Sequence, residues 1–445
     1  MERMESAPRP SLAAIDVVVL IVGLVVGAGI FKAPAIVAAN TGGQELLMLS
    51  WLLGGALSLV GALCYAELAT AYPHTGGEYH FLTRAYGGST GFLFAWSRLA
   101  VLQTGSIALL AFVFGDYASR IYPLGAQGPA LYAAAAVVLL TLVNLVGLNL
   151  TKWTQHVLTS ITLGGLLVVA LAGLLLDPQA SHVAVPAPAT PQAPAFGLAM
   201  VFVLLTYGGW NEAAYVSAEL RNVRRNMVRV LLLGVGTVTL LYLLVNLAYV
   251  RVLGLEGMER SEVVTADLMQ AVLGEQAARL VSALIALAVF ASINVTILTG
   301  ARTSYALARD YRAFSFLGRW GASNAPTTAL VLQAAIALAL VGFGSLGRSG
   351  FESMVEYVSP VFWLFFLLTT FSVLVLRWRD PDRPRPFRVP LYPITPLVFC
   401  GACAYMFYSS LAYTGQGALL GVLLLVAGLP LLFLARPSAQ QHGGH

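Results

Sequence analysis

Two glycine-containing stretches interrupt apolar segments and expose backbone groups that can bind charged ligands. The first is Gly27-Ala28-Gly29, inside "DVVVLIVGLVVGAGIFKAPAIVAAN", and the second is Gly208-Gly209, inside "VFVLLTYGGWNEAAYVSAEL". Glycine in a helix interior costs about 1 kcal/mol relative to alanine, so each stretch predicts a broken helix. A break frees N–H groups where the second half begins and C=O groups where the first half ends. The N–H end attracts a carboxylate, and the C=O end accepts hydrogen bonds from an ammonium group.

The elements that carry these breaks are predicted to span a membrane. Of the 445 residues, 58% are hydrophobic and 10% are charged, whereas soluble domains average about 25% charged residues. Apolar runs of about 20 residues, enough to cross a bilayer, recur along the whole chain. We predict an all-α polytopic membrane protein with twelve transmembrane helices, at 12–40, 44–70, 89–118, 128–149, 153–176, 196–219, 227–253, 277–305, 326–344, 352–376, 390–412 and 416–435.

Basic residues are distributed unevenly among the loops between these spans. With the N-terminus in the cytoplasm, the inner segments hold 18 of the 25 Lys and Arg residues and the outer segments hold five. This asymmetry predicts a multi-pass protein of the cell inner (plasma) membrane with both termini cytoplasmic. The net charge of +5 then reflects topology and contact with lipid headgroups, so no nucleic-acid partner is expected. The N-terminus lacks the pattern of a cleavable signal peptide.

The two breaks occupy corresponding places in two five-helix units that run in opposite directions. Paired glycine-interrupted helices in inverted halves point to the midplane binding site of a transporter. Two facing breaks suit both ends of a zwitterion such as an α-amino acid. For Gly23, Gly27 and Gly54, the alternative is close packing between helices. The predicted units are a cytoplasmic tail (1–11), the first repeat (12–176), an extracytoplasmic loop (177–195), the second repeat (196–376), an inner loop with the last two helices (377–435) and a second cytoplasmic tail (436–445).

Five motifs lie along the chain: "GAGIF" at 27–31, "YAELATAYPHTGGEYHFLTRAYG" at 65–87, "YGGWNEAAYVSAELRN" at 207–222, "ARTSYALARD" at 301–310 and "RPFRVPLYPITP" at 385–396. They resemble motifs of bacterial amino acid permeases in the amino acid–polyamine–organocation (APC) superfamily, particularly the L-type amino acid transporter branch. The resemblance covers nearly all of residues 12–435. It implies discontinuous first and sixth helices and secondary active transport of neutral L-amino acids by alternating access, as an exchanger or with proton coupling.

The resemblance also implies binding residues by position. In similar proteins the substrate carboxylate binds N–H groups of the first break, here those of Ala28 and Gly29. The amino group meets carbonyls of both breaks, here Val25, Leu205 and Gly208. The implied side-chain pocket includes Trp210 and Asn211. The complete predicted binding set is Val25, Gly27, Ala28, Gly29, Ile30, Leu205, Tyr207, Gly208, Gly209, Trp210 and Asn211.

Three positions depart from the family pattern. Family members often have an aromatic gate at the position of Leu205, and leucine offers no cation–π contact, which disfavours a cationic substrate. Many members carry a lysine in the fifth helix that takes the place of a sodium ion, where this chain has Thr162. Lys32 follows the first break, where an apolar residue is more ordinary.

Charged residues in or near apolar spans usually face the bundle interior and mark function or pairing. Glu212 directly follows the second break, so we expect it to pair with Lys32 or to take part in proton coupling. A fixed ion pair, or bonding to exposed backbone N–H groups, is the alternative. Arg98 also lies in a span. The candidate coupling residues are Glu212, Lys32, Glu67, Thr162 and Ser292.

A sodium site is a second hypothesis for coupling. Ser292, Asn294 and Thr296 on the eighth span are candidates to offer oxygens to a cation beside the first break. Hydroxyl groups within spans more often cap or pack helices. The coupling ion is therefore expected to be H⁺ or Na⁺, in a protein that is a monomer or a homodimer in the lipid bilayer.

Other functional classes receive little support. Cys400 and Cys403 form a C-x-x-C pair, but no positive environment activates a thiolate there, so they are interpreted, like Cys64, as packing residues. No G-x-x-x-x-G-K-[ST] motif occurs, most histidines lie in loops or the tail, and no filter loop indicates a channel. We expect no enzyme activity, cofactor or metal site. The alternative function is transport of polyamines or cationic amino acids, with Glu212 as counter-charge.

Overall fold

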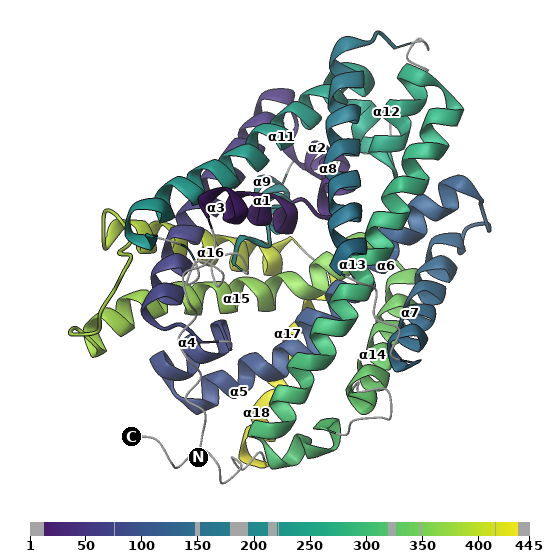
Figure 1. Cartoon of the computed structure of the whole chain (residues 1–445). Helices are drawn as coiled ribbons and strands as arrows, with labels where there is room; N and C mark the ends of the chain where they lie inside the picture. Colours follow the sequence, from purple (N-terminus) through teal and green to yellow (C-terminus); the bar gives the residue numbers. More distant parts are fainter. Residues whose placement is uncertain are drawn as a thin grey trace.

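The computed structural model of the chain is built of helices (Figure 1). It describes residues 13–74, 76–146, 152–178, 195–211, 220, 222–318, 326–347, 349–413 and 415–434. Within these ranges, nine helices are long and apolar enough to cross a membrane, which confirms an all-α polytopic membrane protein. The total of twelve spans stays a prediction.

The elements run in this order: α1 (Ala14–Val25), η1 (Ala28–Phe31), α2 (Ala33–Thr41), α3 (Gln44–Ala71), α4 (Glu78–Tyr86), α5 (Gly88–Ser97), η2 (Arg98–Leu102), α6 (Gln103–Ile121), α7 (Gly128–Val146), α8 (Lys152–Leu175), α9 (Phe196–Thr206), α11 (Val223–Arg260), α12 (Val264–Leu273), α13 (Glu275–Asp310), η4 (Arg312–Gly318), α14 (Thr327–Ser345), α15 (Gly350–Arg379), α16 (Ile394–Ala412), α17 (Gln416–Val426) and α18 (Gly428–Leu434).

Both predicted helix breaks are confirmed. The first span divides into α1, the short 3₁₀ helix η1 and α2. Pro34 lies in the first turn of α2, where a missing N–H leaves no bond unmade. The sixth span ends as α9 at Thr206 and turns through 207–209 before helical structure resumes at Trp210.

Two features differ from the predicted spans. Residues 71–88 were expected to form a loop, yet α4 lies there, with Glu78, Phe81, Leu82 and Ala85 buried. Their spacing of three and four residues is that of a helix with one apolar face. The span predicted at 89–118 contains a π-helical turn, η2. Such turns occur frequently at functional sites.

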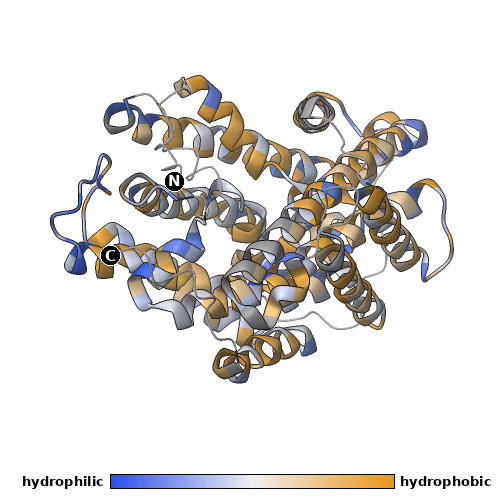
Figure 2. Cartoon of the chain, turned by 60° about the horizontal axis from the view of Figure 1, so that its bottom comes forward, coloured by the Kyte–Doolittle hydropathy of each residue, from blue (hydrophilic) through white to orange (hydrophobic). Residues whose placement is uncertain are grey.

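The helices form two groups that meet near the breaks. In one group, α1 and α3 pack against α11, while α2 and α3 pack against α9. In the other, α6 packs against α7, α13 and α14, and Figure 1 shows these helices together at the right. Helix α8 contacts both α11 and α13. Hydrophobic residues cover most of the helices, and hydrophilic residues gather at several helix ends and in the loop that joins α15 to α16 (Figure 2).

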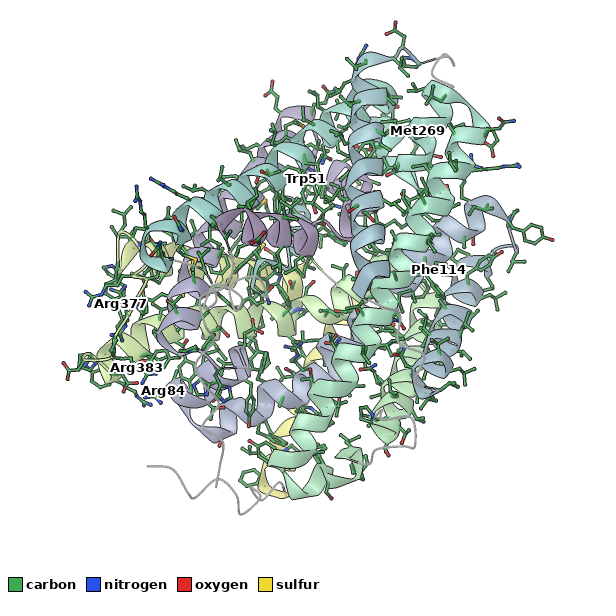
Figure 3. The ribbon with its side chains drawn as sticks, in the orientation of Figure 1. Trp51, Arg84, Phe114, Met269, Arg377 and Arg383 are labelled. Atoms are coloured by element: carbon green, nitrogen blue, oxygen red, sulfur yellow. The ribbon has the colours of Figure 1, made fainter. Side chains whose placement is uncertain are left out.

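A cluster of charged residues, Glu67, Arg84, Arg377, Asp380 and Arg383, fixes one end of α3 and α15. The Glu67 carboxylate accepts hydrogen bonds from Arg377 at 2.7 and 2.6 Å and from the Val389 N–H at 2.6 Å. Arg84 donates to Asp380 at 3.0 Å, and this bond holds the pKa of Asp380 below its usual range. Figure 3 shows Arg84, Arg377 and Arg383 at the same edge of the molecule.

Gly54 allows α3 to approach α9 closely, so the packing interpretation is confirmed for this glycine. A Cβ atom at Gly54 would lie 2.3 Å from Val203 Cγ1 and 2.9 Å from the ring of Tyr207. At Gly27, by contrast, the nearest atom is 3.9 Å away. Small residues at helix contacts in membranes permit this kind of approach.

We predict that Gly54→Ala lowers the thermal stability of the purified protein. The added methyl group meets two fully buried side chains, and overpacking of this kind costs about 1–3 kcal/mol. The measurement is the melting temperature in detergent. Gly236→Ala on α11 is the control, because nothing lies within 4 Å of its Cβ position. Equal melting temperatures for the two variants would contradict the prediction.

Candidate functional site

The two helix breaks touch each other. Gly209 has a φ of +109°, a conformation that side-chain-bearing residues rarely adopt. A Cβ atom at this position would also lie 2.5 Å from the carbonyl oxygen of Leu24, in the last turn of α1. Glycine is therefore required here for two independent reasons. At the first break, a Cβ on Gly29 would lie 2.8 Å from Thr206 Oγ1, so η1 packs equally closely on the end of α9.

Tyr242 of α11 joins the ends of both first half-helices. Its hydroxyl lies 3.0 Å from the Val25 carbonyl oxygen and 3.3 Å from that of Thr206, and it donates toward both. The ring is fully buried and packs edge-on against Trp51 and Tyr207. A single side chain thus fixes the spacing of the two carbonyl ends.

The N–H end of the site is formed by η1. Its N-cap residue is Gly27, which has no side chain that could cap the N–H groups of the helix. The first-turn N–H groups, including those of Ala28 and Gly29, have no acceptor within the helix. They form a cradle with partial positive charge, suited to a carboxylate. Ile30, also in the predicted binding set, is fully buried in the core.

The C=O end is formed by α1, α9 and the turn that follows α9. Val25 accepts from Tyr242, and the Leu205 carbonyl accepts from the Gly208 N–H at 3.0 Å. Each carbonyl oxygen has two lone pairs, so both can accept a further bond from an ammonium group. The Asn211 Oδ1 atom accepts from the Gly209 N–H at 3.3 Å and thereby supports the turn.

Two aromatic residues of the predicted set are packing residues in this conformation. Trp210 is 3% exposed, and its ring contacts those of Tyr65, Phe366 and Phe399 at centroid distances of 5.2 to 5.7 Å. Tyr207 is fully buried and donates its hydroxyl hydrogen to the Trp51 carbonyl at 2.9 Å. Both rings anchor the turn of the second break against neighbouring helices.

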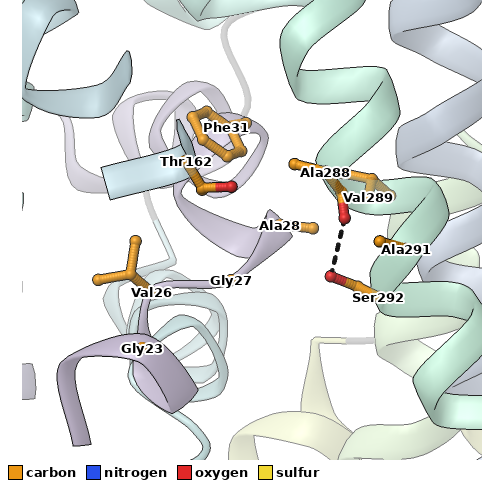
Figure 4. Close-up of a pocket in the computed structure, with 10 residues that line it drawn as sticks. All are labelled: Gly23, Val26, Gly27, Ala28, Phe31, Thr162, Ala288, Val289, Ala291 and Ser292. Carbon is orange, nitrogen blue, oxygen red and sulfur yellow. Dashed lines mark hydrogen bonds between the residues drawn. The ribbon is translucent and has the colours of Figure 1, made fainter. Parts of the chain in front are cut away.

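A cavity of about 80 Å³ opens beside the first break (Figure 4). It brings together residues that the sequence singled out separately, namely Gly27 and Ala28 of the break, Thr162 of α8 and Ser292 of α13. The Ser292 hydroxyl donates to the Ala288 carbonyl at 3.1 Å, and its lone pairs stay free to accept. Gly23, considered above as a packing glycine, also lines the cavity. The lining residues that sequence reasoning missed are Val26, Phe31, Ala288, Val289 and Ala291.

Asn294 does not join this cavity, which corrects the expectation for it. Its Oδ1 atom accepts a 2.7 Å hydrogen bond from Asn144 of α7. Two residues along an α-helix correspond to a turn of about 200°, so Asn294 faces away from Ser292. Thr296 lies on the same face as Ser292 and donates to the Ser292 carbonyl at 2.8 Å.

The charged residues within the spans have distinct surroundings. Lys32 pairs with Asp116 at 2.7 Å, although the sequence pointed to Glu212, which lies outside the described residues. Glu67 pairs with Arg377 and its side chain is 2% exposed. Arg98 lies in the π-helical turn and makes no ion pair with any residue that the structure describes.

Two important residues were missed although the sequence contained a signal for each. Asp116 lies inside the span predicted at 89–118, where a carboxylate requires a partner. Tyr242 is a hydroxyl-bearing residue in the middle of an apolar run. Only the fold could identify what either side chain contacts.

Comparison with known proteins agrees with this geometry. Residues 12–429 match the Amino acid permease family. The chain is 31% identical over 382 residues to the b(0,+)-type amino acid transporter 1 of Mus musculus, covering 84% of this chain and 77% of that protein. It is 30% identical over 435 residues to the Large neutral amino acids transporter small subunit 2 of Homo sapiens, covering 93% and 78%. The chain therefore belongs to the Amino acid permease family of the APC superfamily, and it is an integral membrane protein that transports amino acids rather than an enzyme.

Proposed function

We propose that this permease carries neutral L-amino acids by alternating access and binds each zwitterion between its two helix breaks. The observation that supports this most directly is the close contact of Gly209 with Leu24, which brings the carbonyl ends of both half-helices beside the start of η1. A site with donors at one end and acceptors at the other matches an α-carboxylate and an α-ammonium group. The name of the relative in Homo sapiens, a large neutral amino acids transporter, agrees with this substrate class.

The proposed roles follow the polarity of the backbone. The carboxylate binds the N–H groups of Ala28 and Gly29, and the ammonium group binds carbonyls of Val25, Leu205 and Gly208. Leu205 adjoins the turn of the second break, where it offers an apolar surface but no aromatic face. A cationic side chain gains no cation–π contact there, so neutral substrates are favoured.

The proposed topology places both termini in the cytoplasm of a bacterial cell, with the protein in the inner membrane. Support comes from the excess of basic residues in alternate loops. The cluster of Arg84, Arg377 and Arg383 then lies on the inner side and α12 on the outer side. The segments 12–176 and 196–376 are proposed to be inverted repeats that move relative to each other.

We propose obligatory exchange or proton coupling as the driving mechanism, with Glu212 and Glu67 as candidate coupling groups. The cavity lined by Thr162 and Ser292 supports a second candidate, a sodium site next to the first break. Its hydroxyl and backbone oxygens are ligands that a hard cation accepts.

Uptake into proteoliposomes tests the substrate class. We expect radiolabelled L-leucine and L-alanine to enter vesicles preloaded with unlabelled amino acid, because exchange requires a counter-substrate. Unlabelled neutral amino acids should compete, whereas arginine and putrescine should not. Uptake into empty vesicles under a proton gradient would favour symport. Competition by putrescine or arginine alone would overturn the neutral assignment.

Tyr242→Phe tests the proposed binding site. Removing the hydroxyl leaves two buried carbonyls without their donor, which costs about 1–3 kcal/mol. We therefore expect about a tenfold loss of transport efficiency. The matched control is Tyr249→Phe on the same helix, whose hydroxyl lies 2.6 Å from Thr265 Oγ1 instead. The proposal fails if both variants transport like the wild type or lose activity equally.

Replacing external sodium with choline separates the two coupling candidates. Exchange or proton coupling predicts unchanged uptake of L-leucine, because no sodium ion takes part. Loss of uptake in choline would instead assign a sodium ion to the cavity. In that case Thr162→Val and Ser292→Ala should raise the sodium concentration that gives half-maximal uptake, while Thr303→Val, farther along α13, should not.

A further inference from the structure

The buried ion pair between Lys32 and Asp116 lies directly beside the first break and has no part in the site described so far. Lys32 is the residue between η1 and α2, and its Nζ atom lies 2.7 Å from Asp116 Oδ2. The same ammonium donates to the Glu262 carbonyl at 2.5 Å, in the segment between α11 and α12. The two side chains are 10% and 14% exposed. Three separate segments therefore meet at one ammonium group.

A second contact reinforces the first. The hydroxyl of Tyr117, the next residue of α6, donates to the Phe31 carbonyl at 2.8 Å. The rings of Phe31 and Tyr117 also pack edge-to-face at a centroid distance of 6.4 Å. Helix α6 thus holds two consecutive residues, Phe31 and Lys32, immediately after the N–H groups that face the substrate site.

The pair crosses the boundary between the two groups of helices. The segment that carries Lys32 packs on α9 and α11 through α2, whereas Asp116 belongs to α6, which packs on α7, α13 and α14. Any movement of α2 away from α6 must separate the two charges. In a nearly dry environment this separation is unfavourable, because each charge loses the partner that compensated for its desolvation.

We propose that the Lys32–Asp116 pair is a latch that keeps the outer side of the substrate site closed and that opens when η1 and α2 leave α6. The inference rests on the proposed function for its orientation, since it assigns α12 and the adjoining end of α6 to the outer side. Lys32 is a positioning residue in this account. It contacts no substrate, but it sets the balance between the conformations that face the two sides of the membrane.

Val113 provides a reporter position for the latch. It is fully buried on α6, one helical turn before Tyr117 on the same face. A cysteine at this position should be reached by reagents from outside only after η1 and α2 have moved. The native Cys64, Cys400 and Cys403 are all buried, so the wild type supplies the labelling baseline.

The test is the rate at which Val113→Cys reacts with a membrane-impermeant methanethiosulfonate reagent added outside reconstituted vesicles. We expect Asp116→Asn and Lys32→Met each to raise this rate about tenfold or more. Each change destabilises the conformation in which the outer side is closed, so the outward-open conformation becomes more populated. The apparent KM should fall for substrate on the outside and rise for substrate on the inside. The charge-swapped double variant, Lys32→Asp with Asp116→Lys, should restore slow labelling.

The matched control is Arg251→Gln. This change removes the ion pair between Arg251 and Asp177, whose Nη2 and Oδ1 atoms lie 3.2 Å apart. The pair is exposed, lies on the proposed outer side and contacts neither break. It should change neither the labelling rate nor the two KM values.

A second variant covers the case in which the single substitutions prevent folding. Replacing both charges, as in Lys32→Met with Asp116→Leu, leaves no lone buried charge and should fold. Fast labelling is expected from this variant too. Slow labelling together with equal KM values on both sides would overturn the latch while transport itself continues. Absence of uptake by the wild type would instead overturn the proposed function.

Discussion

A backbone N–H or C=O group cannot be left without a partner inside a bilayer, and the whole arrangement around the site follows from that constraint. Ordinary spanning helices satisfy it internally. This chain interrupts two of them, at 26–27 and 207–209, so the freed groups must be satisfied by other parts of the protein or by a ligand. Tyr242 supplies a donor to the carbonyl ends. The N–H groups that begin η1 are the complementary set, and an amino acid carboxylate suits them.

Close packing is what makes such breaks tolerable. Gly54 lets α3 approach α9, and Gly209 lets the second break approach the end of α1. Val26 and Tyr207 are buried at the breaks, whereas Gly27, Gly208 and Gly209 are partly exposed. A cavity of about 80 Å³ opens between the first break, α8 and α13. In this conformation the freed backbone groups of both breaks therefore lie close together, which suits the binding of a small ligand.

Ion pairs secure the two ends of the same bundle. Glu67 with Arg377 and Val389 ties α3 to α15 and to the segment before α16. Lys32 with Asp116 ties the segment after the first break to α6 near the opposite end. Both carboxylates lie in helices but bond to residues far away in the sequence. Separating the partners of a buried pair leaves each charge without the compensation for its desolvation, so such a pair favours the arrangement in which it is formed.

Apolar length and glycine placement are local properties, so the all-α membrane architecture, the two breaks and the residues at them could be predicted from the sequence. It also identified Thr162 and Ser292, which the fold brings to one cavity. It did not determine the partners of side chains. Lys32 pairs with Asp116, Asn294 accepts a hydrogen bond from Asn144 of α7, and Trp210 packs among aromatic rings. Those outcomes depend on helix rotation and on distances between elements, which only the tertiary structure fixes.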